Sequence, residues 1–155
     1  MLGHKSYYVS FTDDQMCYTQ LYFMGAKSDT FGRYWEYEVW LDNQFSMQAW
    51  CLWSNYRSKY LSDEFKCHLY DHGTEQQLTT NDHLQVNSIT EQLNCTLIEH
   101  MQTILHTSGL SKTLWGDTIV YCVWIKNHTV TKALDGATLY ELVYKCKLNI
   151  QNIPV

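Results

Sequence analysis

The strongest structural pattern in this chain is an apolar repeat between residues 89 and 105. The repeat consists of Ile89, Leu93, Leu97, Met101 and Leu105, each four positions after the last. Side chains at this spacing lie on one face of an α-helix, and a glycine often follows a helix end. The sequence therefore predicts a long helix from Asn87 to Gly109, with Glu91 off its apolar face.

The segments on either side of this helix alternate between β-forming and helical patterns. We expect strands at residues 6–12, 18–24 and 46–53 and a short edge strand at 76–79, with the first two antiparallel across a turn at 13–17. Capping residues predict helices that run from Asp29-Thr30 to Asn43, from Ser62 to Gly73 and from Ser111 to Asn127, with a short one starting at Thr138. This order predicts an α/β domain with a mixed sheet and helices on its faces.

Composition narrows the class of protein. A chain of 155 residues has room for one core, and its net charge of -5 argues against a strong electrostatic footprint for nucleic acid. No secretory signal is visible in residues 1–10, and the most apolar segment, 118–125, is too short to span a bilayer. We therefore expect an intracellular chain with no membrane partner, whose six cysteines are free thiols because no CxxC pair occurs. The twelve tyrosines and six tryptophans are expected mainly in the core.

Three groups of polar residues invite an alternative interpretation. Cys67, His68 and His72 have zinc-like spacing, but the glutamate of the HExxH pattern is missing, so we do not expect a zinc site there. Asp13 and Asp14 are expected to make turn hydrogen bonds. Lysines gather towards the C-terminus and could contact phosphates, although a solvated face fits the acidic chain better. These lysines are Lys112, Lys126, Lys132, Lys145 and Lys147.

The chain resembles the integrase catalytic core of copia-type retrotransposon polyproteins over nearly its whole length. The segments YYVSFTDD (Tyr7–Asp14) and DTFGRYWEYEVWLDNQF (Asp29–Phe45) match the family's first segments, and Trp53–Phe65 and His83–Leu97 match the segments that carry catalytic acids. The most specific signature is KNHTVTKALDGATLYE, at Lys126–Glu141. The resemblance implies a ribonuclease-H-like mixed sheet flanked by helices and lacking the first strand. It predicts a core-like domain at 1–130, truncated at its N-terminus, and an extension of the core at 131–155.

In this family three carboxylates bind two Mg²⁺ (or Mn²⁺) ions, which stabilise the attacking and leaving oxygens during DNA integration. The first aspartate belongs to a strand that precedes Tyr7 and is absent, the second corresponds to Asn55, and the third is retained as Glu91, with 35 residues between these two. An amide is a poor substitute for a carboxylate between divalent ions, so Glu91 is expected to be a vestigial ligand and the chain to bind no metal.

Other departures surround these positions. The family's Arg-Gly-Gly turn after the second aspartate is replaced at residues 56–58, and Ser88 replaces a glycine in a turn that we expect to need positive φ. Proline is replaced at Leu84, Ser111, Leu139 and Leu148. The changes at Asn55, Ser58 and Ser88 and at the four proline positions each need only one C-to-T or G-to-A transition in a codon, which indicates a degenerate copy.

The resemblance implies DNA as the family's partner, self-association of integrase chains, and a nuclear location. For this copy we expect no catalysis. Two alternatives stay open: a non-catalytic DNA- or protein-binding module built on the integrase fold, and an active enzyme that recruits its missing aspartate from elsewhere.

Overall fold

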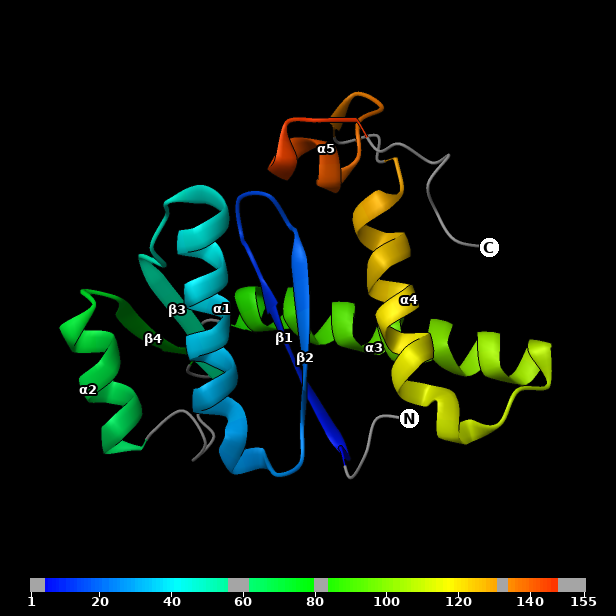
Figure 1. Cartoon of the computed structure of the whole chain (residues 1–155), viewed down its shortest axis with the longest axis horizontal. Coiled ribbons are helices and arrows are strands. Elements are labelled where there is room, and N and C mark those ends of the chain that lie inside the picture. Colours follow the sequence, from blue (N-terminus) through cyan, green and yellow to red (C-terminus); the bar gives the residue numbers. More distant parts are fainter. Residues whose placement is uncertain (1–4, 56–61, 80–83, 131–133, 148–155) are drawn as a thin grey trace. The chain divides into compact units, whose positions relative to one another are not determined.

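A computed structural model describes residues 5–55, 62–79, 84–130 and 134–147 (Figure 1). The strands are β1 (Tyr7–Thr12), β2 (Thr19–Met24), β3 (Cys51–Asn55) and β4 (Glu75–Thr79). The helices are α1 (Thr30–Phe45), α2 (Asp63–Asp71), α3 (Leu84–Ser108), α4 (Trp115–His128) and α5 (Leu139–Tyr144), and the 3-10 turns η1 (Lys27–Asp29) and η4 (Lys112–Leu114) precede α1 and α4. The predicted order of elements is confirmed.

The strands pair as β1 with β2 and β3 with β4. β1 and β2 are antiparallel, because Ser6 N–H donates to the Met24 carbonyl (3.1 Å) at one end and Asp13 N–H to that of Tyr18 (3.0 Å) at the other. The expected turn bond also forms, since the Asp13 carboxylate accepts the Met16 N–H at 2.6 Å. β3 and β4 are parallel, so the described strands form two sheets of two strands each, one antiparallel and one parallel.

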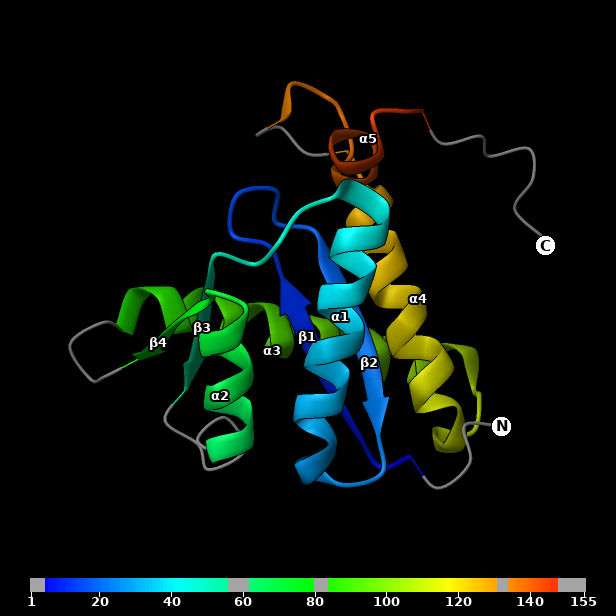
Figure 2. The same ribbon diagram turned by 60° about the vertical axis from the view of Figure 1, so that its left-hand side comes forward.

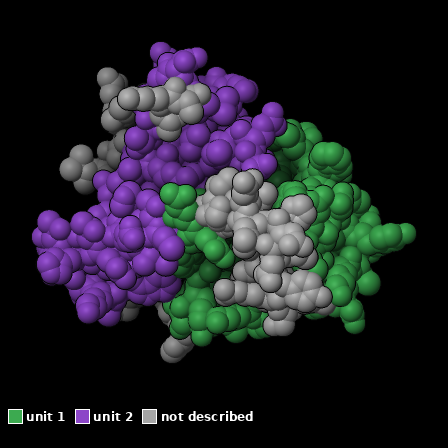
Figure 3. All heavy atoms as spheres, turned by 180° about the vertical axis from the view of Figure 1, so that it is seen from behind, with its two compact units in different colours: residues 1–11, 22–94 green, residues 12–21, 95–155 purple. Residues whose placement is uncertain are grey.

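The chain divides into two compact units, shown in different colours in Figure 3. Unit 1 contains residues 1–11 and 22–94, and unit 2 contains residues 12–21 and 95–155. The β1–β2 hairpin and α3 each supply residues to both units. The division at residue 130 stays a prediction.

The core of unit 1 lies between the hairpin and two helices. Apolar side chains bury against one another there: Val9, Phe11 and Met24 from the hairpin, Tyr34 and Tyr37 from α1, and Phe65 and Leu69 from α2. The Phe11 ring lies 5.7 Å from the Tyr34 ring and 4.9 Å from that of Tyr37. Figure 2 shows α1 running alongside the hairpin, as this packing requires. Burial of these rings from water is the main force that holds α1 in place.

The core of unit 2 forms around α4. Its buried face carries Ile119, Cys122 and Val123, and the buried Leu139 and Val143 belong to α5, which packs against α4. All six cysteines are free thiols, as predicted. Within the described ranges, no helix has the length and apolar character needed to cross a membrane.

The expectation that tryptophans build the core is wrong. Four of the six are exposed, from 36% at Trp124 to 84% at Trp50, and the other two are only partly buried. On α1 the buried face is set by Thr30, Tyr34 and Tyr37, and Trp35 follows Tyr34 by one position, a rotation of about 100° around the helix. Trp35 therefore points away from the core.

Two predicted boundaries are also wrong. β3 begins at Cys51 and not at residue 46, because Ser46 adopts a left-handed conformation (φ 51°) and donates its N–H to the Asp42 carbonyl, which ends α1. α3 begins at Leu84, three residues before the predicted start at Asn87. Ser88 is consequently helical, so the turn with positive φ that was expected there does not form.

Candidate functional site

Asn55 is the last residue of β3. In the parallel pairing it lies opposite Thr79 of β4, and the preceding pair is Ser54 with Leu78. Ser54 is buried and Trp53 is 41% exposed, so the strand alternates between a covered and an open side. Ligands of α/β proteins commonly bind at the carboxyl ends of strands. The backbone of Asn55 is therefore at a suitable place for a site; its side chain and residues 56–59 lie outside the described residues.

Glu91 lies in α3, about two turns after Leu84. Its side chain is exposed. One turn further on, the side-chain amide oxygen (Oδ1) of Asn94 accepts a hydrogen bond from the Ser10 hydroxyl of β1 at 3.2 Å. Side chains three positions apart share a helix face. Glu91 thus projects from the side of α3 that contacts β1, while Asn55 is positioned by β4.

The residue types at these two positions do not fit a two-metal site. Mg²⁺ requires oxygen ligands, and a pair of ions about 4 Å apart requires several negative charges. Glu91 supplies one carboxylate, and Asn55 can offer only a neutral amide oxygen. Among the residues that the structure describes, no three His, Cys, Asp or Glu side chains are grouped to hold a metal ion.

The zinc-like histidines have other partners. His68 Nε2 pairs with the Glu38 carboxylate, and both side chains are nearly buried, at 13% and 14% exposed. His72 Nδ1 bonds to the His68 carbonyl at 2.8 Å, and the two imidazole rings are 4.1 Å apart. Cys67 is exposed. These contacts join α1 to α2 and lie at the end of α2.

Lys126 is neither a phosphate contact nor part of a solvated face. Its Nζ donates to the Cys17 carbonyl and, at 2.9 Å, to the Thr19 hydroxyl. Burial lowers the pKa of this amine, and the nearby Cys17 acts in the opposite direction. Lys112, Lys145 and Lys147 are exposed, and Lys132 lies outside the described residues.

The neighbouring Asn127 is a structural residue that sequence reasoning missed. Its Nδ2 donates to the Thr19 carbonyl (2.8 Å) and its Oδ1 accepts the Thr19 N–H (3.2 Å), while the side chain is 3% exposed. Asn127 and Lys126 begin the signature at 126–141, and near its end the Thr138 hydroxyl and Glu141 carboxylate form a reciprocal helix cap. The most specific motif of the chain therefore holds unit 2 together.

Comparisons with known proteins agree with this architecture. No family model matches the chain. It is 23% identical over 128 residues to the Retrovirus-related Pol polyprotein from transposon TNT 1-94 of Nicotiana tabacum, an alignment that covers 83% of this chain and 10% of that protein. The chain resembles a retrotransposon integrase core. It spans about a tenth of the length of the curated polyprotein that it matches.

Two solved structures share the integrase-core fold. One is a chain of the simian T-cell lymphotropic virus intasome in complex with PP2A regulatory subunit B56 gamma, with 12% identity, a TM-score of 0.69, and coverage of 96% of this chain and 51% of that one. The other is the HTLV-2 integrase catalytic core domain in complex with magnesium (trimeric form), with 10% identity, a TM-score of 0.62, and coverage of 88% and 91%. The integrase core's ribonuclease-H-like fold is thus retained.

Proposed function

We propose that this chain is a catalytically inactive copy of the integrase core of a copia-type retrotransposon. The observation that carries the proposal is the amide at Asn55, the last residue of β3, combined with a single carboxylate at Glu91 on α3. Integration of DNA by phosphoryl transfer needs metal-bound oxygens at both the attacking and the leaving group. The neutral amide of Asn55 does not supply the negative charge that two divalent ions require at this position.

Calorimetric titration of the purified chain with Mn²⁺ tests this proposal. We expect no saturable binding to the natural chain at millimolar Mn²⁺. Asn55→Asp restores the second carboxylate and should create a weak site, which Asn55→Asp/Glu91→Gln should abolish. The matched control is Glu99→Gln, which changes an exposed glutamate two turns further along α3. Mn²⁺ binding by the natural chain that is lost in Glu91→Gln would refute the proposal.

A second candidate is a nucleic-acid-binding module without chemistry. It is favoured by the uneven charge of the chain: unit 1 carries six basic residues against ten carboxylates, and unit 2 carries five lysines against six. Unit 2 is therefore the less repulsive part for DNA. A gel shift with duplex DNA at low salt, lost as salt is raised, is the expected result for this function. Absence of a shift at low salt excludes it. A nuclear location, tested by microscopy of the tagged chain, belongs to the same proposal.

Self-association of copies is supported by the outward side of α4. Val120 (45%), Tyr121 (53%), Trp124 (36%) and Ile125 (36%) are exposed there, so α4 is apolar on both its buried and its open sides. A helix of that kind is normally covered on both sides. Sedimentation should give a mass that rises with concentration in the natural chain and a monomer in Tyr121→Glu/Trp124→Glu. A natural chain that stays monomeric at high concentration excludes this interface.

A further inference from the structure

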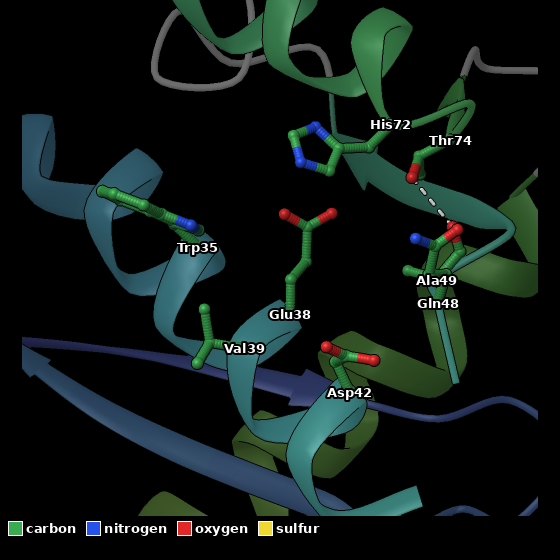
Figure 4. Close-up of a pocket in the computed structure, with 8 residues that line it drawn as sticks. All are labelled: Trp35, Glu38, Val39, Asp42, Gln48, Ala49, His72 and Thr74. Carbon is green, nitrogen blue, oxygen red and sulfur yellow. Dashed lines mark hydrogen bonds between the residues drawn. The ribbon is translucent and has the colours of Figure 1, made fainter. Parts of the chain in front are cut away.

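A hollow of about 220 Å³ opens beside α1 in unit 1 (Figure 4). One wall is a single face of α1, formed by Trp35, Glu38, Val39 and Asp42. The other wall is formed by Gln48 and Ala49, just before β3, and by His72 and Thr74, between α2 and β4. None of these eight residues is a lysine or an arginine. The hollow differs from the Asn55 position in its chemical character, because two acidic side chains from one face of α1 line it.

The two carboxylates make the hollow attractive to a cation. Figure 4 shows the Glu38 carboxylate directed into the space between Trp35 and His72, with the Asp42 carboxylate beside Gln48 and Ala49. Glu38 is 14% exposed, and one of its oxygens is held by His68 Nε2, so the carboxylate is fixed in orientation. A carboxylate removed from water in this way gains from a further donor.

Two polar groups of the opposite wall are bonded within the protein. The Thr74 hydroxyl donates to the Ala49 carbonyl at 2.8 Å, and His72 Nδ1 is bonded to the His68 carbonyl at 2.8 Å. These bonds fix Thr74 and His72 in orientation opposite the carboxylates of α1.

The indole of Trp35 adds a flat surface at the same place. It is 57% exposed although tryptophan is one of the largest apolar side chains. Cations bind over the face of an indole within about 6 Å, and guanidinium groups stack on it particularly well. The arrangement of one indole and two carboxylates therefore favours a planar cation with several N–H donors.

The size of the hollow limits the ligand. Sites for whole small molecules usually have about 300 to 1,000 Å³, and this hollow is smaller. We propose that it binds the guanidinium group of an arginine side chain from a peptide partner, with the carboxylates of Glu38 and Asp42 accepting N–H bonds and the Trp35 indole stacking on the plane. Lysine fits less well, because its ammonium is not planar and is more strongly hydrated.

The test is an NMR titration of the ¹⁵N-labelled chain with acetyl-Gly-Arg-Gly-amide, observing the indole N–H signals. The Trp35 signal is identified by its absence in Trp35→Phe. We expect the Trp35 signal to shift saturably with this arginine peptide. The shift should be smaller with the same peptide carrying lysine in place of arginine, and absent with the same peptide carrying neutral citrulline. Asp42→Asn should weaken binding by about threefold or more, since an exposed ion pair and its hydrogen bonds are lost. Asp42 is exposed, so this variant should fold.

Glu99→Gln, which removes an exposed carboxylate from α3, is the matched control and should bind as the natural chain does. Equal binding of the citrulline peptide, full affinity in Asp42→Asn, or a shift confined to another indole would overturn the proposal. Tighter binding of the tripeptide than of free arginine supports a peptide partner, and equal binding would overturn that part. None of these readouts depends on catalysis or on metal.

Discussion

At the residue scale, the side chain of Asn127 takes the place of a neighbouring strand at the start of β2. Its side-chain amide pairs with both the N–H and the carbonyl of Thr19, as the backbone of a neighbouring strand would. Lys126 reaches the same turn through Cys17 and Thr19. Asn127 thus satisfies two backbone groups of Thr19 that would otherwise be buried without partners.

Replacement of Asn127 by alanine should lower the free energy of unfolding by about 2 to 4 kcal/mol, because two buried backbone groups lose their partners. Urea denaturation measures the loss. Asn43→Ala, an exposed asparagine on α1, serves as the control and should change stability by less than about 0.5 kcal/mol. Equal effects of the two substitutions would contradict the role assigned to Asn127.

Buried tyrosines should make the fold sensitive to alkali. Burial, with a smaller effect from Glu36, raises the pKa of Tyr22 to about 12, and burial also raises the pKa of Tyr18 and Tyr34. A tyrosine in the unfolded chain ionises near 10.0, so above that pH the unfolded state binds fewer protons and stability falls. Lys126 has the opposite sign, since its lowered pKa makes its burial less costly as the pH rises towards 10.5.

Urea denaturation at pH 8, 10.5 and 11.5 tests this expectation. The natural chain should lose stability between the two higher values, and Tyr22→Phe should lose less. Tyr70→Phe, at a residue that is 85% exposed, should behave as the natural chain does. A stability that stays constant between pH 10.5 and 11.5 would show that the tyrosines are not held as described.

At the scale of elements, the residues at helix starts determine where several helices begin. Ser62 accepts the Phe65 N–H at the start of α2, and Thr138 and Glu141 cap α5 reciprocally. Leu84 and Leu139, where the resemblance implies prolines, are the first residues of α3 and α5. Proline suits that position, because its N–H would have no partner within the helix.

This placement predicts a contrast between two proline variants of α5. The free energy of unfolding of Leu139→Pro should lie within about 1 kcal/mol of that of Leu139→Ala, or above it. That of Leu142→Pro should be about 3 kcal/mol lower than that of Leu142→Ala. The reason is that the Leu142 N–H donates to the Thr138 carbonyl at 3.1 Å, a bond that proline removes. Thermal melts measure both pairs, and a large penalty for proline at 139 would contradict the assigned start of the helix.

The sequence predicted the elements better than their limits. Local signals were sufficient where one residue type has one mechanism, as with the Ser62 cap or the left-handed Gly73 (φ 68°) that follows α2. They failed at residue 46, where a serine takes the left-handed conformation that glycine usually adopts. They also could not find Asn127, because its partner Thr19 is 108 residues away in sequence. The hollow beside α1 depends on packing between three segments of the chain, so no local sequence pattern could predict it.

At the scale of the whole molecule, the proposed function separates the fold from the chemistry. The integrase-core architecture is retained at 10% and 12% identity to solved structures, because it rests on cores such as the one around Phe11 and Tyr34. The proposed loss of activity rests on one position, Asn55. A fold that depends on many buried contacts tolerates such a change, whereas a metal site that depends on three carboxylates does not.

The most direct test of this account is a strand-transfer assay of the purified chain with element-end DNA in Mg²⁺ or Mn²⁺. We predict no product above the background of the Glu91→Gln variant. The folded state of both proteins, checked by circular dichroism, ensures that a negative result reports on chemistry. Metal-dependent product from the natural chain that disappears in Glu91→Gln would contradict the account.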